Sequence, residues 1–282
     1  MHINLLRNLL VCPACRSNLS THANGLNCNH CLAVYQFVDG KVIFTTTPAK
    51  NEHNSLDQLK SKIKKFPTIY KFLSEVVAPV YVSKKRLKIF ISEIDKNNLV
   101  GLNLGSGITN YSQKIINFDL QDFKNVEVIG DLFQLPFRDC TFDYIFNLYV
   151  LEHVPDPKLA VEEIHRVLKP GGIGYFLIPF IQGFHAAPND YFRFTSKGVE
   201  SYFQGFDIIK NRGLGPTSAM LWILQEWLAI VLSFNSQKLH LVMHTLIVCI
   251  SFPLKYLDVI LSKFFSVNNI ASVNEVIARK SL

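Results

Sequence analysis

The stretch VGLNLGSGITNYSQKIINFDLQDFKNVEVIGD, from Val100 to Asp131, decides the fold. One short apolar run ends in the turn Gly105-Ser106-Gly107, a second ends at Asp119, and a third ends at Asp131. Successive strand-sized runs favour an open parallel sheet, in which ligands bind at the carboxyl ends of the strands. We therefore expect one glycine turn and two carboxylates to converge on a single crevice.

The chemistry of that crevice is that of a nucleoside site. Gly105 and Gly107 have no Cβ, so the backbone can approach a ligand closely. A carboxylate such as Asp119 can accept the hydroxyl hydrogens of a ribose. A glycine turn alone is a weak signal, and either aspartate alone is more simply explained as a turn cap. The order of the three features along the chain favours the nucleoside site.

The residues after this stretch continue the same pattern of strand and helix. Phe142 to Leu148 reads as a fourth strand, and Lys158 to Leu168 has the apolar spacing of an amphipathic helix. Pro170-Gly171-Gly172 would stop that helix, and Ile173 to Pro179 would form a fifth strand. The alternation predicts a doubly wound α/β sheet.

With these motifs in this order, Asn98 to Lys210 resembles the class I S-adenosylmethionine-dependent methyltransferases, particularly the type 11 family that includes quinone-biosynthesis methyltransferases. The resemblance implies a Rossmann-like sheet of seven strands, with Phe206 to Lys210 as the sixth and Ser272 to Arg279 as an antiparallel seventh. It also implies methyl transfer from S-adenosyl-L-methionine. The chain departs from the family's pattern in Asn103, where an acidic residue is usual, and in Thr109, where a third glycine is usual. The first crossover is also too short for a full helix.

Carried over position by position, the resemblance implies contacts to each part of the cofactor. The glycine turn would line the methionine and ribose, the end of the second strand the ribose diol, and the end of the third strand the adenine. The segment after the fourth strand would close over the sulfonium side. The implied residues are Asn103, Gly105, Ser106, Gly107, Asp119, Leu120, Asp131, Leu132, Asn147 and His153.

The loop FIQGFHAAPNDYFRFTSKG follows the fifth strand and carries side chains able to do chemistry. His185, Asp190, Tyr191 and Arg193 would therefore face the crevice that holds the methyl donor, and we predict the acceptor site there. His185 is the candidate base for a hydroxyl acceptor, and Asp190 or Arg193 would orient the substrate. The alternative is an ion pair between Asp190 and Arg193 that only holds the loop, beside an exposed His185.

Two CxxC pairs near the N-terminus predict a structural zinc site. Twelve residues separate the pair Cys12 and Cys15 from the pair Cys28 and Cys31, and four thiolates complete a tetrahedral zinc shell. The segment that follows has Asp39-Gly40 at its centre, which is typical of a type I′ hairpin. Residues Leu9 to Phe44 thus read as a zinc ribbon and resemble the small zinc-ribbon activators of methyltransferases. The alternatives are four buried thiols or a redox pair.

Composition and charge limit the partners. A chain that is 49% hydrophobic can bury a full core, which excludes a disordered protein. The net charge of +7 is concentrated in residues 50–96, where eleven Lys or Arg face five Asp or Glu. This region would contact RNA phosphates or an anionic membrane, or form a solvated helix face. The basic residues are Lys60, Lys62, Lys64 and Lys65, followed by Lys84, Lys85, Arg86 and Lys88.

The segment from Thr217 to Ser266 is an apolar insertion before the last strand. Gln225-Glu226 interrupts its first half, and His244 and Pro253 limit its second, so we expect neither half to span a bilayer. A helical lid over the crevice is one interpretation. An anchor at the membrane interface, with Trp222, Trp227 and Tyr256 near the headgroups, is the favoured one.

These signals predict a methyltransferase for a hydrophobic or lipid-linked small molecule at a membrane surface. An RNA methyltransferase is the first alternative, which the apolar insertion fits poorly, and a non-catalytic scaffold is the second. Cysteine usage and the lack of a secretory signal predict a cytoplasmic protein, peripheral to the membrane. The predicted parts are a zinc ribbon (1–46), a linker with helices (47–97), the methyltransferase core (98–216), the insertion (217–266) and a final strand (267–282).

Overall fold

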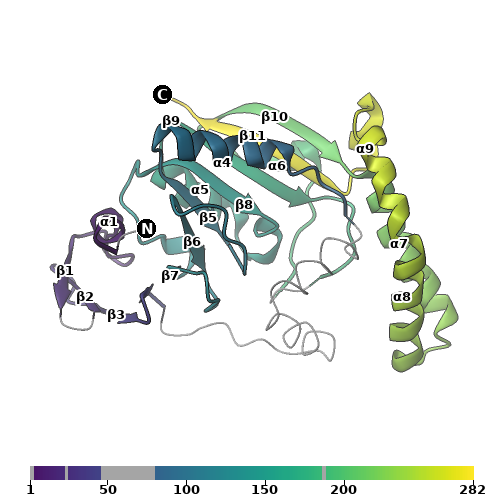
Figure 1. Ribbon diagram of the computed structural model, residues 1–282, viewed down its shortest axis with the longest axis horizontal. Coiled ribbons are helices and arrows are strands. Elements are labelled where there is room, and N and C mark those ends of the chain that lie inside the picture. Colours follow the sequence, from purple (N-terminus) through teal and green to yellow (C-terminus); the bar gives the residue numbers. More distant parts are fainter. Residues whose placement is uncertain (1–2, 23–24, 46–79, 186–188) are drawn as a thin grey trace.

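The computed structural model describes residues 3–22, 25–45, 80–185 and 189–282, and within them eleven strands form one sheet. Seven of these strands lie in the order β7-β6-β5-β8-β9-β11-β10 (Figure 1). Along the order β7-β6-β5-β8-β9 each strand is parallel to the next, and β11 runs antiparallel to both β9 and β10. Their bounds are β5 (Gly101–Leu104), β6 (Ile115–Asp119), β7 (Val128–Ile129), β8 (Phe142–Leu148), β9 (Leu168–Pro179), β10 (Phe206–Leu214) and β11 (Val273–Lys280).

This arrangement confirms the doubly wound α/β fold. From β5 the chain builds outward through β6 to β7, and it then returns to place β8 and β9 on the other side of β5. The strand order therefore reverses between β5 and β8, and in open α/β sheets ligands bind at such a switch point.

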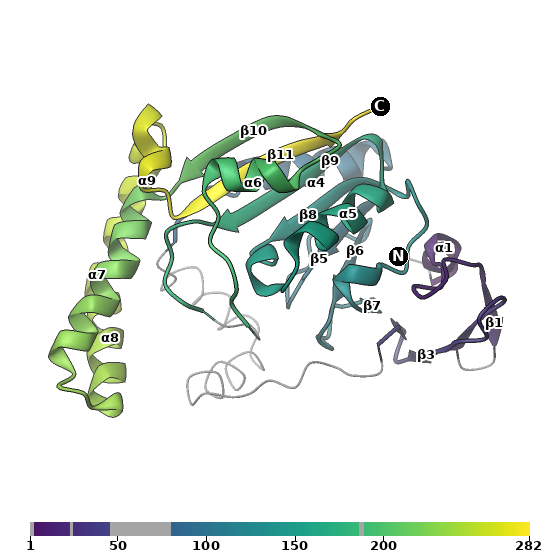
Figure 2. The ribbon, with the colours of Figure 1, turned by 180° about the vertical axis from the view of Figure 1, so that it is seen from behind.

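The seven predicted strands are part of a larger sheet, because four N-terminal strands, predicted as a separate small domain, extend it. They are β1 (Leu19–His22), β2 (Gly25–Cys28), β3 (Val34–Val38) and β4 (Lys41–Ile43), and β4 pairs in parallel with β7, Val42 opposite Val128. They lie at the end of the sheet opposite β10 (Figure 2). Strand β7 is only two buried residues long, so β4 covers an edge that would otherwise be unpaired.

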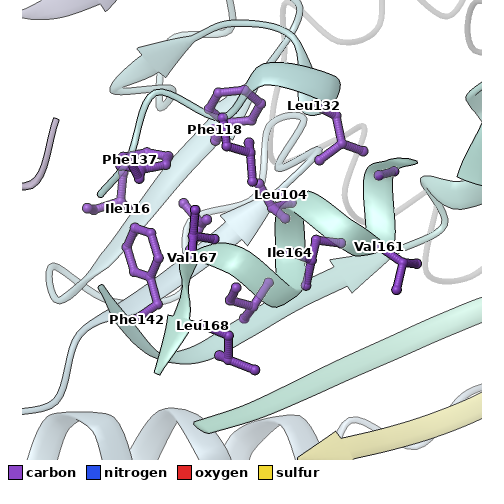
Figure 3. Close-up of a cluster of buried hydrophobic side chains, with 14 of the residues drawn as sticks. Leu104, Ile116, Phe118, Leu132, Phe137, Phe142, Val161, Ile164, Val167 and Leu168 are labelled. Carbon is purple, nitrogen blue, oxygen red and sulfur yellow. The ribbon is translucent and has the colours of Figure 1, made fainter. Parts of the chain in front are cut away.

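The two faces of the sheet are covered by different helices. Helix α4 (Lys85–Asn97) packs Leu87 and Ile94 on one face, against Phe146 and Tyr175. Helices α5 (Pro157–Val167) and α6 (Ser196–Tyr202) cover the other. Figure 3 shows the cluster around α5, formed by Leu104, Ile116, Phe118, Leu132, Phe137, Phe142, Val161, Ile164, Val167 and Leu168. Burial on both faces explains why the parallel strands read as continuous apolar runs.

Helix α5 begins where its sequence predicts. The carboxylate of Asp156 accepts hydrogen bonds from the N–H groups of Lys158 and Leu159, and Pro157 occupies the first turn. The helix ends at Val167, and β9 begins at Leu168 rather than at Ile173. The ladder with β8 passes from Leu168 directly to Ile173, so residues 169–172 form a bulge at the start of β9, in which Gly171 has a φ of +77°.

The first crossover, residues 105–114, contains turns and no helix in this described stretch, which confirms the predicted truncation. Helix α4 precedes β5 instead and packs close to it, since a Cβ on Gly101 would lie 3.2 Å from Ile94 Cδ1. The predicted linker and the first predicted helices, up to residue 79, lie outside the described residues.

The apolar insertion forms a separate helical layer beside the sheet, at the end opposite β1 to β4 (Figures 1 and 2). It contains α7 (Pro216–Leu232), α8 (Gln237–Ser251), η3 (Phe252–Leu257), α9 (Asp258–Leu261) and η4 (Phe265–Asn269). The buried carboxylate of Asp258 accepts hydrogen bonds from the N–H groups of Thr217 and Ser218, at 2.7 and 2.9 Å. These bonds fix the first turn of α7 to the end of the insertion.

The helical segment from Gln237 to Leu261 is long and apolar enough, by length and composition, to cross a membrane. This differs from the expectation that neither half of the insertion could span a bilayer. Pro253 does not end the helical course, because it lies in the first turn of η3, where a missing N–H breaks no intrahelical bond. One such helix is weak evidence for a span. Only 17% of its most apolar window is buried in the protein.

Candidate functional site

The glycine turn and the end of β6 are joined directly. Gly105 and Gly107 have φ values of +66° and +53°, and the Gly107 N–H donates to Asp119 Oδ2 at 2.8 Å. The Ser106 N–H donates to the Phe118 carbonyl at 3.1 Å, and Asp119 Oδ1 accepts from the Gln121 N–H at 2.9 Å. The predicted convergence of the turn and the first carboxylate is therefore present.

The second predicted carboxylate lies on the neighbouring strand. Asp119 is opposite Ile129 in the β6–β7 ladder, and Asp131 follows β7 two residues later. Asp131 is exposed and accepts a hydrogen bond from the Phe133 N–H, which caps η1 (Leu132–Gln134). Leu132 is buried beneath it, and Leu120 is half-buried. The adenine and ribose positions implied by the resemblance thus share one edge.

Three polar side chains at this edge are buried. Asn103 donates from Nδ2 to Asn117 Oδ1 at 3.1 Å and so supports the turn from below. Asn147 lies beside Leu104 in the β5–β8 ladder and is fully buried. Neither its amide oxygen nor its nitrogen, nor the Ser106 hydroxyl, has a hydrogen-bond partner among the described residues. Such groups cost about 1–3 kcal/mol each when unpaired, so they fit a site that receives a polar ligand.

The acceptor side is built from η2 (Leu151–His153) and the loop after β9. Tyr149 has a φ of +60°, which is strained for a bulky residue, and turns the chain from β8 into η2. The Tyr191 N–H donates to the Glu152 carbonyl at 2.8 Å, which joins the two segments. The ring of His185 lies 5.3 Å from that of His153. The residues predicted to face the crevice from β8 and β9 are therefore neighbours.

Asp190 and Arg193 form an ion pair, with 2.5 Å between Nη1 and Oδ1. Arg193 also donates to the carbonyls of Gln182 and Gly183, and Asp190 accepts from the His185 N–H at 2.8 Å. Burial would raise the pKa of Asp190, but Arg193 outweighs it and holds that pKa below the usual value. This geometry is that of the alternative in which the pair holds the loop. A substrate-orienting role for either residue stays a prediction.

His185 is partly exposed and packs against the insertion, with 5.4 Å between its ring centroid and that of Trp222 in α7. Burial alone would lower the pKa of His185, but the Glu152 and Asp190 carboxylates and the Gly183 carbonyl raise it above its usual value. The side chain of Tyr191 is exposed, at 48%. The roles of base for His185 and of substrate contact for Tyr191 stay predictions.

The four N-terminal cysteines gather around one centre. The Sγ atoms of Cys12 and Cys31 are 3.6 Å apart, those of Cys15 and Cys28 are 3.3 Å apart, and all four lie within 4.8 Å of one another without a disulfide. Tetrahedral zinc with sulfur at about 2.3 Å places its ligands about 3.8 Å apart. The arrangement therefore fits zinc, while the metal itself and the resemblance to methyltransferase activators stay predictions.

The N-terminal segment is attached to the domain through specific contacts. Asp39 and Gly40 both have positive φ, 48° and 81°, which confirms the predicted type I′ hairpin between β3 and β4. After α1 (Ile3–Leu9), Leu10 bridges to Phe137, and Arg16 pairs with Glu163 of α5 at 2.8 Å. The N-terminal segment and the sheet domain thus share one core.

Only part of the predicted basic cluster lies on the surface of the described residues. Lys84, Lys85 and Lys88 are exposed at the start of α4. Arg86 turns inward, with Nε 3.3 Å from the buried Glu275 carboxylate. Lys60 to Lys65 lie outside the described residues. The cluster near α4 is therefore smaller than the sequence suggests.

A parallel sheet with a glycine turn after β5 and a carboxylate ending β6 defines an α/β domain of the nucleoside-binding kind. Comparison with known proteins is consistent with this class, since residues 99–176 match the family model described as "Methyltransferase domain". The doubly wound α/β fold is therefore confirmed, and residues 99–176 are similar to a methyltransferase domain.

The relatives share that part of the chain. The chain is similar to sterol 24-C-methyltransferase of Schizosaccharomyces pombe, 42% identical over 29% of this chain and 22% of that protein. It is also similar to demethylmenaquinone methyltransferase of Geobacillus stearothermophilus, 45% identical over 25% of this chain and 32% of that protein. The chain therefore spans about a fifth to a third of the length of these curated relatives.

Similar solved structures include phosphoethanolamine N-methyltransferase 2 of Haemonchus contortus with S-adenosyl-L-methionine. It has a TM-score of 0.47 and 15% identity, and the match covers 82% of this chain and 61% of that one. The [4+2]-cyclase SpnF has a TM-score of 0.45 and 15% identity, covering 83% of this chain and 98% of that one.

Proposed function

We propose that this protein is an S-adenosylmethionine-dependent methyltransferase. The observation that carries the proposal is the bond between Gly107 and Asp119, with the unpaired Asn147 and Ser106 beside it. A ligand with a ribose diol and a charged amino acid end would satisfy these groups. The match of residues 99–176 to the methyltransferase family supports the same cofactor.

Different residues would bind different parts of the proposed cofactor. Asp119 with Leu120 would bind the ribose, Asp131 with Leu132 the adenine, and Asn147 with Ser106 the methionine end. His153 would close the pocket from η2. When bound, S-adenosylmethionine supplies a methyl group activated by a positively charged sulfur. The chain's own task is then to align the acceptor and to exclude water.

Calorimetry with S-adenosylmethionine tests this proposal. Replacing Asp119 by Ala removes a charged acceptor of two ribose hydrogen bonds, each worth about 1.5–3 kcal/mol, so affinity should fall roughly 100-fold or more. The matched control is Asp207→Ala, because Asp207 is an exposed carboxylate on the edge strand β10. Absence of binding to the wild type, or equal binding by the Asp119 variant, would support the non-catalytic scaffold instead.

We also propose that the acceptor is hydrophobic or lipid-linked. The sterol and menaquinone methyltransferases among the relatives are named for lipophilic substrates. In this chain the apolar insertion contacts the predicted acceptor loop, since Trp222 packs on Gly183 and His185. Acceptors that reach His185 and Tyr191 would therefore pass along an apolar wall. Incubation with labelled S-adenosylmethionine and separate lipid and RNA extracts would show which fraction becomes methylated.

We propose that α7 and α8 dock on a membrane surface from the cytoplasmic side. Many large apolar side chains of the insertion are exposed. A helical lid on a soluble protein would leave fewer of them in contact with water. They include Met220, Ile223, Trp227, Ile230, Phe234, Val242, Leu246, Ile250, Ile260 and Phe265. Flotation with anionic and neutral liposomes measures this binding. A protein that stays in the soluble fraction with both would remove the membrane from the proposal.

We propose that Cys12, Cys15, Cys28 and Cys31 hold a structural zinc ion. Four sulfur ligands leave no open position, so the ion would stabilise the N-terminal strands rather than react. The experiment is metal analysis of the purified chain against a variant with Ser at Cys12 and Cys28. One zinc equivalent lost in the variant is the expected result.

A further inference from the structure

Glu152, His153 and His185 bring together three ligand atoms that are not explained by cofactor binding. Nε2 of His153 and Nε2 of His185 each lie 3.7 Å from Glu152 Oε1, and the three atoms are within 4.8 Å of one another. The Glu152 side chain is 0% exposed. Neither of its oxygens has a hydrogen-bond partner among the residues that the structure describes.

Backbone carbonyls fix the orientation of both imidazole rings. Nδ1 of His153 lies 2.6 Å from the Asn189 carbonyl, and Nδ1 of His185 lies 2.9 Å from the Gly183 carbonyl. A carbonyl can only accept, so each Nδ1 carries a proton, and Nε2 is the nitrogen of each ring that faces Glu152. Arg193 Nη2 is also 3.2 Å from Nδ1 of His185, but it donates to Gly183 and Asp190.

Three potential ligand atoms therefore face one another around a buried carboxylate. A separation of 3.7 Å is too long for a hydrogen bond. An unpaired buried carboxylate costs several kcal/mol. A cation bound between the three atoms would offset this cost.

The spacing matches a metal ion. Three ligands at about 2.1 Å in a tetrahedral shell lie about 3.4 Å from one another, close to the two measured separations of 3.7 Å. Metal-bound histidines usually donate their second ring N–H to a carbonyl or carboxylate. Both histidines already make that contact.

We propose that Glu152, His153 and His185 bind one divalent transition-metal ion of the Zn²⁺ class through Glu152 Oε1 and the two Nε2 atoms. Two imidazoles and one carboxylate suit such an ion and leave a coordination position open. Metal binding rests on this geometry alone and does not depend on the proposed function. In the metal-bound protein His185 is a ligand and not the base predicted from the sequence.

The place of the ion suggests its use, and this part does rest on the proposed function. Glu152 and His153 follow β8, and His185 follows β9, at the edge where the acceptor is expected. An oxygen of the acceptor would take the open position. Coordination lowers the pKa of a hydroxyl group, whose proton then passes to water, so no protein base is needed.

The test counts metal ions in the full chain prepared without a polyhistidine tag. The protein is stripped with a chelator, reloaded with Zn²⁺ or Co²⁺, freed of excess metal and analysed by mass spectrometry. We expect two equivalents in the wild type, one at the cysteines and one here. Glu152→Gln and His185→Gln should each retain one, with the second affinity weakened more than about 100-fold.

Cobalt spectra separate the two sites. The Glu152 and His185 variants should keep the intense charge-transfer bands of cobalt bound to thiolates, and a Cys12→Ser, Cys28→Ser variant should lose them but keep weak d–d bands. The matched control is His240→Gln, His244→Gln. These two histidines lie near the half-exposed Glu226 in the insertion, at 3.1 and 3.6 Å. This control should still bind two ions.

Thermal unfolding provides a readout that does not depend on metal counting. Glu152→Gln removes a buried unpaired charge, so its metal-free form should be at least as stable as the metal-free wild type. Zn²⁺ should raise the wild-type melting temperature further than that of Glu152→Gln. One equivalent in the wild type, or two in Glu152→Gln and His185→Gln, overturns the proposal. Calorimetry of S-adenosylmethionine with Glu152→Gln separates failure of this site from failure of the methyltransferase proposal.

Discussion

Replacing Gly107 by Ala separates the stability of the glycine turn from its proposed use in cofactor binding. Gly107 has a φ of +53°, and a Cβ built there meets no atom of the described residues within 4 Å. The new methyl group therefore points into open space in the ligand-free protein. We expect it to meet the cofactor instead, because the proposed methionine and ribose positions lie against this turn.

The two costs can be estimated separately. A left-handed conformation costs a residue with a Cβ about 1–2 kcal/mol, with no steric addition here. For a chain of this size that loss lowers the melting temperature by roughly 2–8 °C. A methyl group placed in the ligand's volume should cost at least about 1.4 kcal/mol more, which is a further tenfold or greater loss of affinity.

The assay pairs thermal unfolding with calorimetry of S-adenosylmethionine, and Gly40→Ala is the matched control. Gly40 in the β3–β4 turn has a φ of +81° and equally open surroundings, so its variant should lose similar stability. It lies outside the proposed site and should bind the cofactor as the wild type does. If Gly107→Ala and Gly40→Ala bind equally well, the cofactor does not lie against this turn.

Four further outcomes follow from the contacts. Gly105→Ala places a Cβ 2.4 Å from Val150 Cγ2 at a φ of +66°. It should cost about 2–4 kcal/mol in urea unfolding, partly restored by adding Val150→Ala. Burial would raise the pKa of Glu163, but Arg166 and Arg16 hold it below the usual value. The ionised Glu163 carboxylate therefore stabilises the fold fully above its unfolded pKa near 4.3. This contribution is lost as the pH falls through the lower pKa of the folded state. Glu163→Gln should cost about 3 kcal/mol near neutral pH, and urea titrations should show a smaller difference in strong acid. A chelator should expose the thiols of both CxxC pairs to a thiol reagent and lower the melting temperature, since β4 would no longer be held against β7. The side chain of Phe265 is 98% exposed, so Phe265→Ser should change the free energy of unfolding by no more than about 0.5 kcal/mol. The free energy of liposome binding, measured by flotation, should become weaker by about 1.5–3 kcal/mol.

The parts of the fold that could be predicted are those fixed by local chemistry. The bounds of β8 agree with the predicted strand Phe142 to Leu148, because the segment FDYIFNL is rich in aromatic and aliphatic residues. Asp39-Gly40 determines its hairpin because both residues adopt positive φ without help from the rest of the chain. Asp156 and Pro157 mark the start of α5 in the same local way.

The parts that could not be predicted depend on tertiary contacts. The pairing of β4 with β7 joins two short strands far apart in sequence, and no local signal specifies it. The start of β9 was placed at Ile173 because Gly171 and Gly172 resemble a helix stop, whereas the strand begins at Leu168 and has a bulge over residues 169–172 in its ladder with β8. The positive φ of Tyr149 has no sequence signal of its own.

The candidate site shows the same division. The glycines and aspartates at strand ends could be recognised in the sequence. Asp119 lies beside the glycine turn at the end of β6, as predicted. Glu152 was read as part of a closing segment, because nothing in the sequence shows that its carboxylate is buried between two imidazoles. The partnership of Asp190 and Arg193 was weighed as an alternative, and only coordinates could show that both are engaged within the loop.

The insertion and the acceptor loop form one mechanical unit. Trp222 of α7 packs on Gly183 and His185, and Asp258 fixes the start of α7 to the end of the insertion. The Gln182 amide donates to the Ser272 hydroxyl at 3.1 Å, which ties the loop to the residues just before β11. A shift of α7 would therefore also move the ring of His185, because Trp222 contacts it directly. If the hairpin docks on a membrane as proposed, docking would orient His185 at the place where a lipid-linked acceptor enters, so binding and alignment would depend on the same helix.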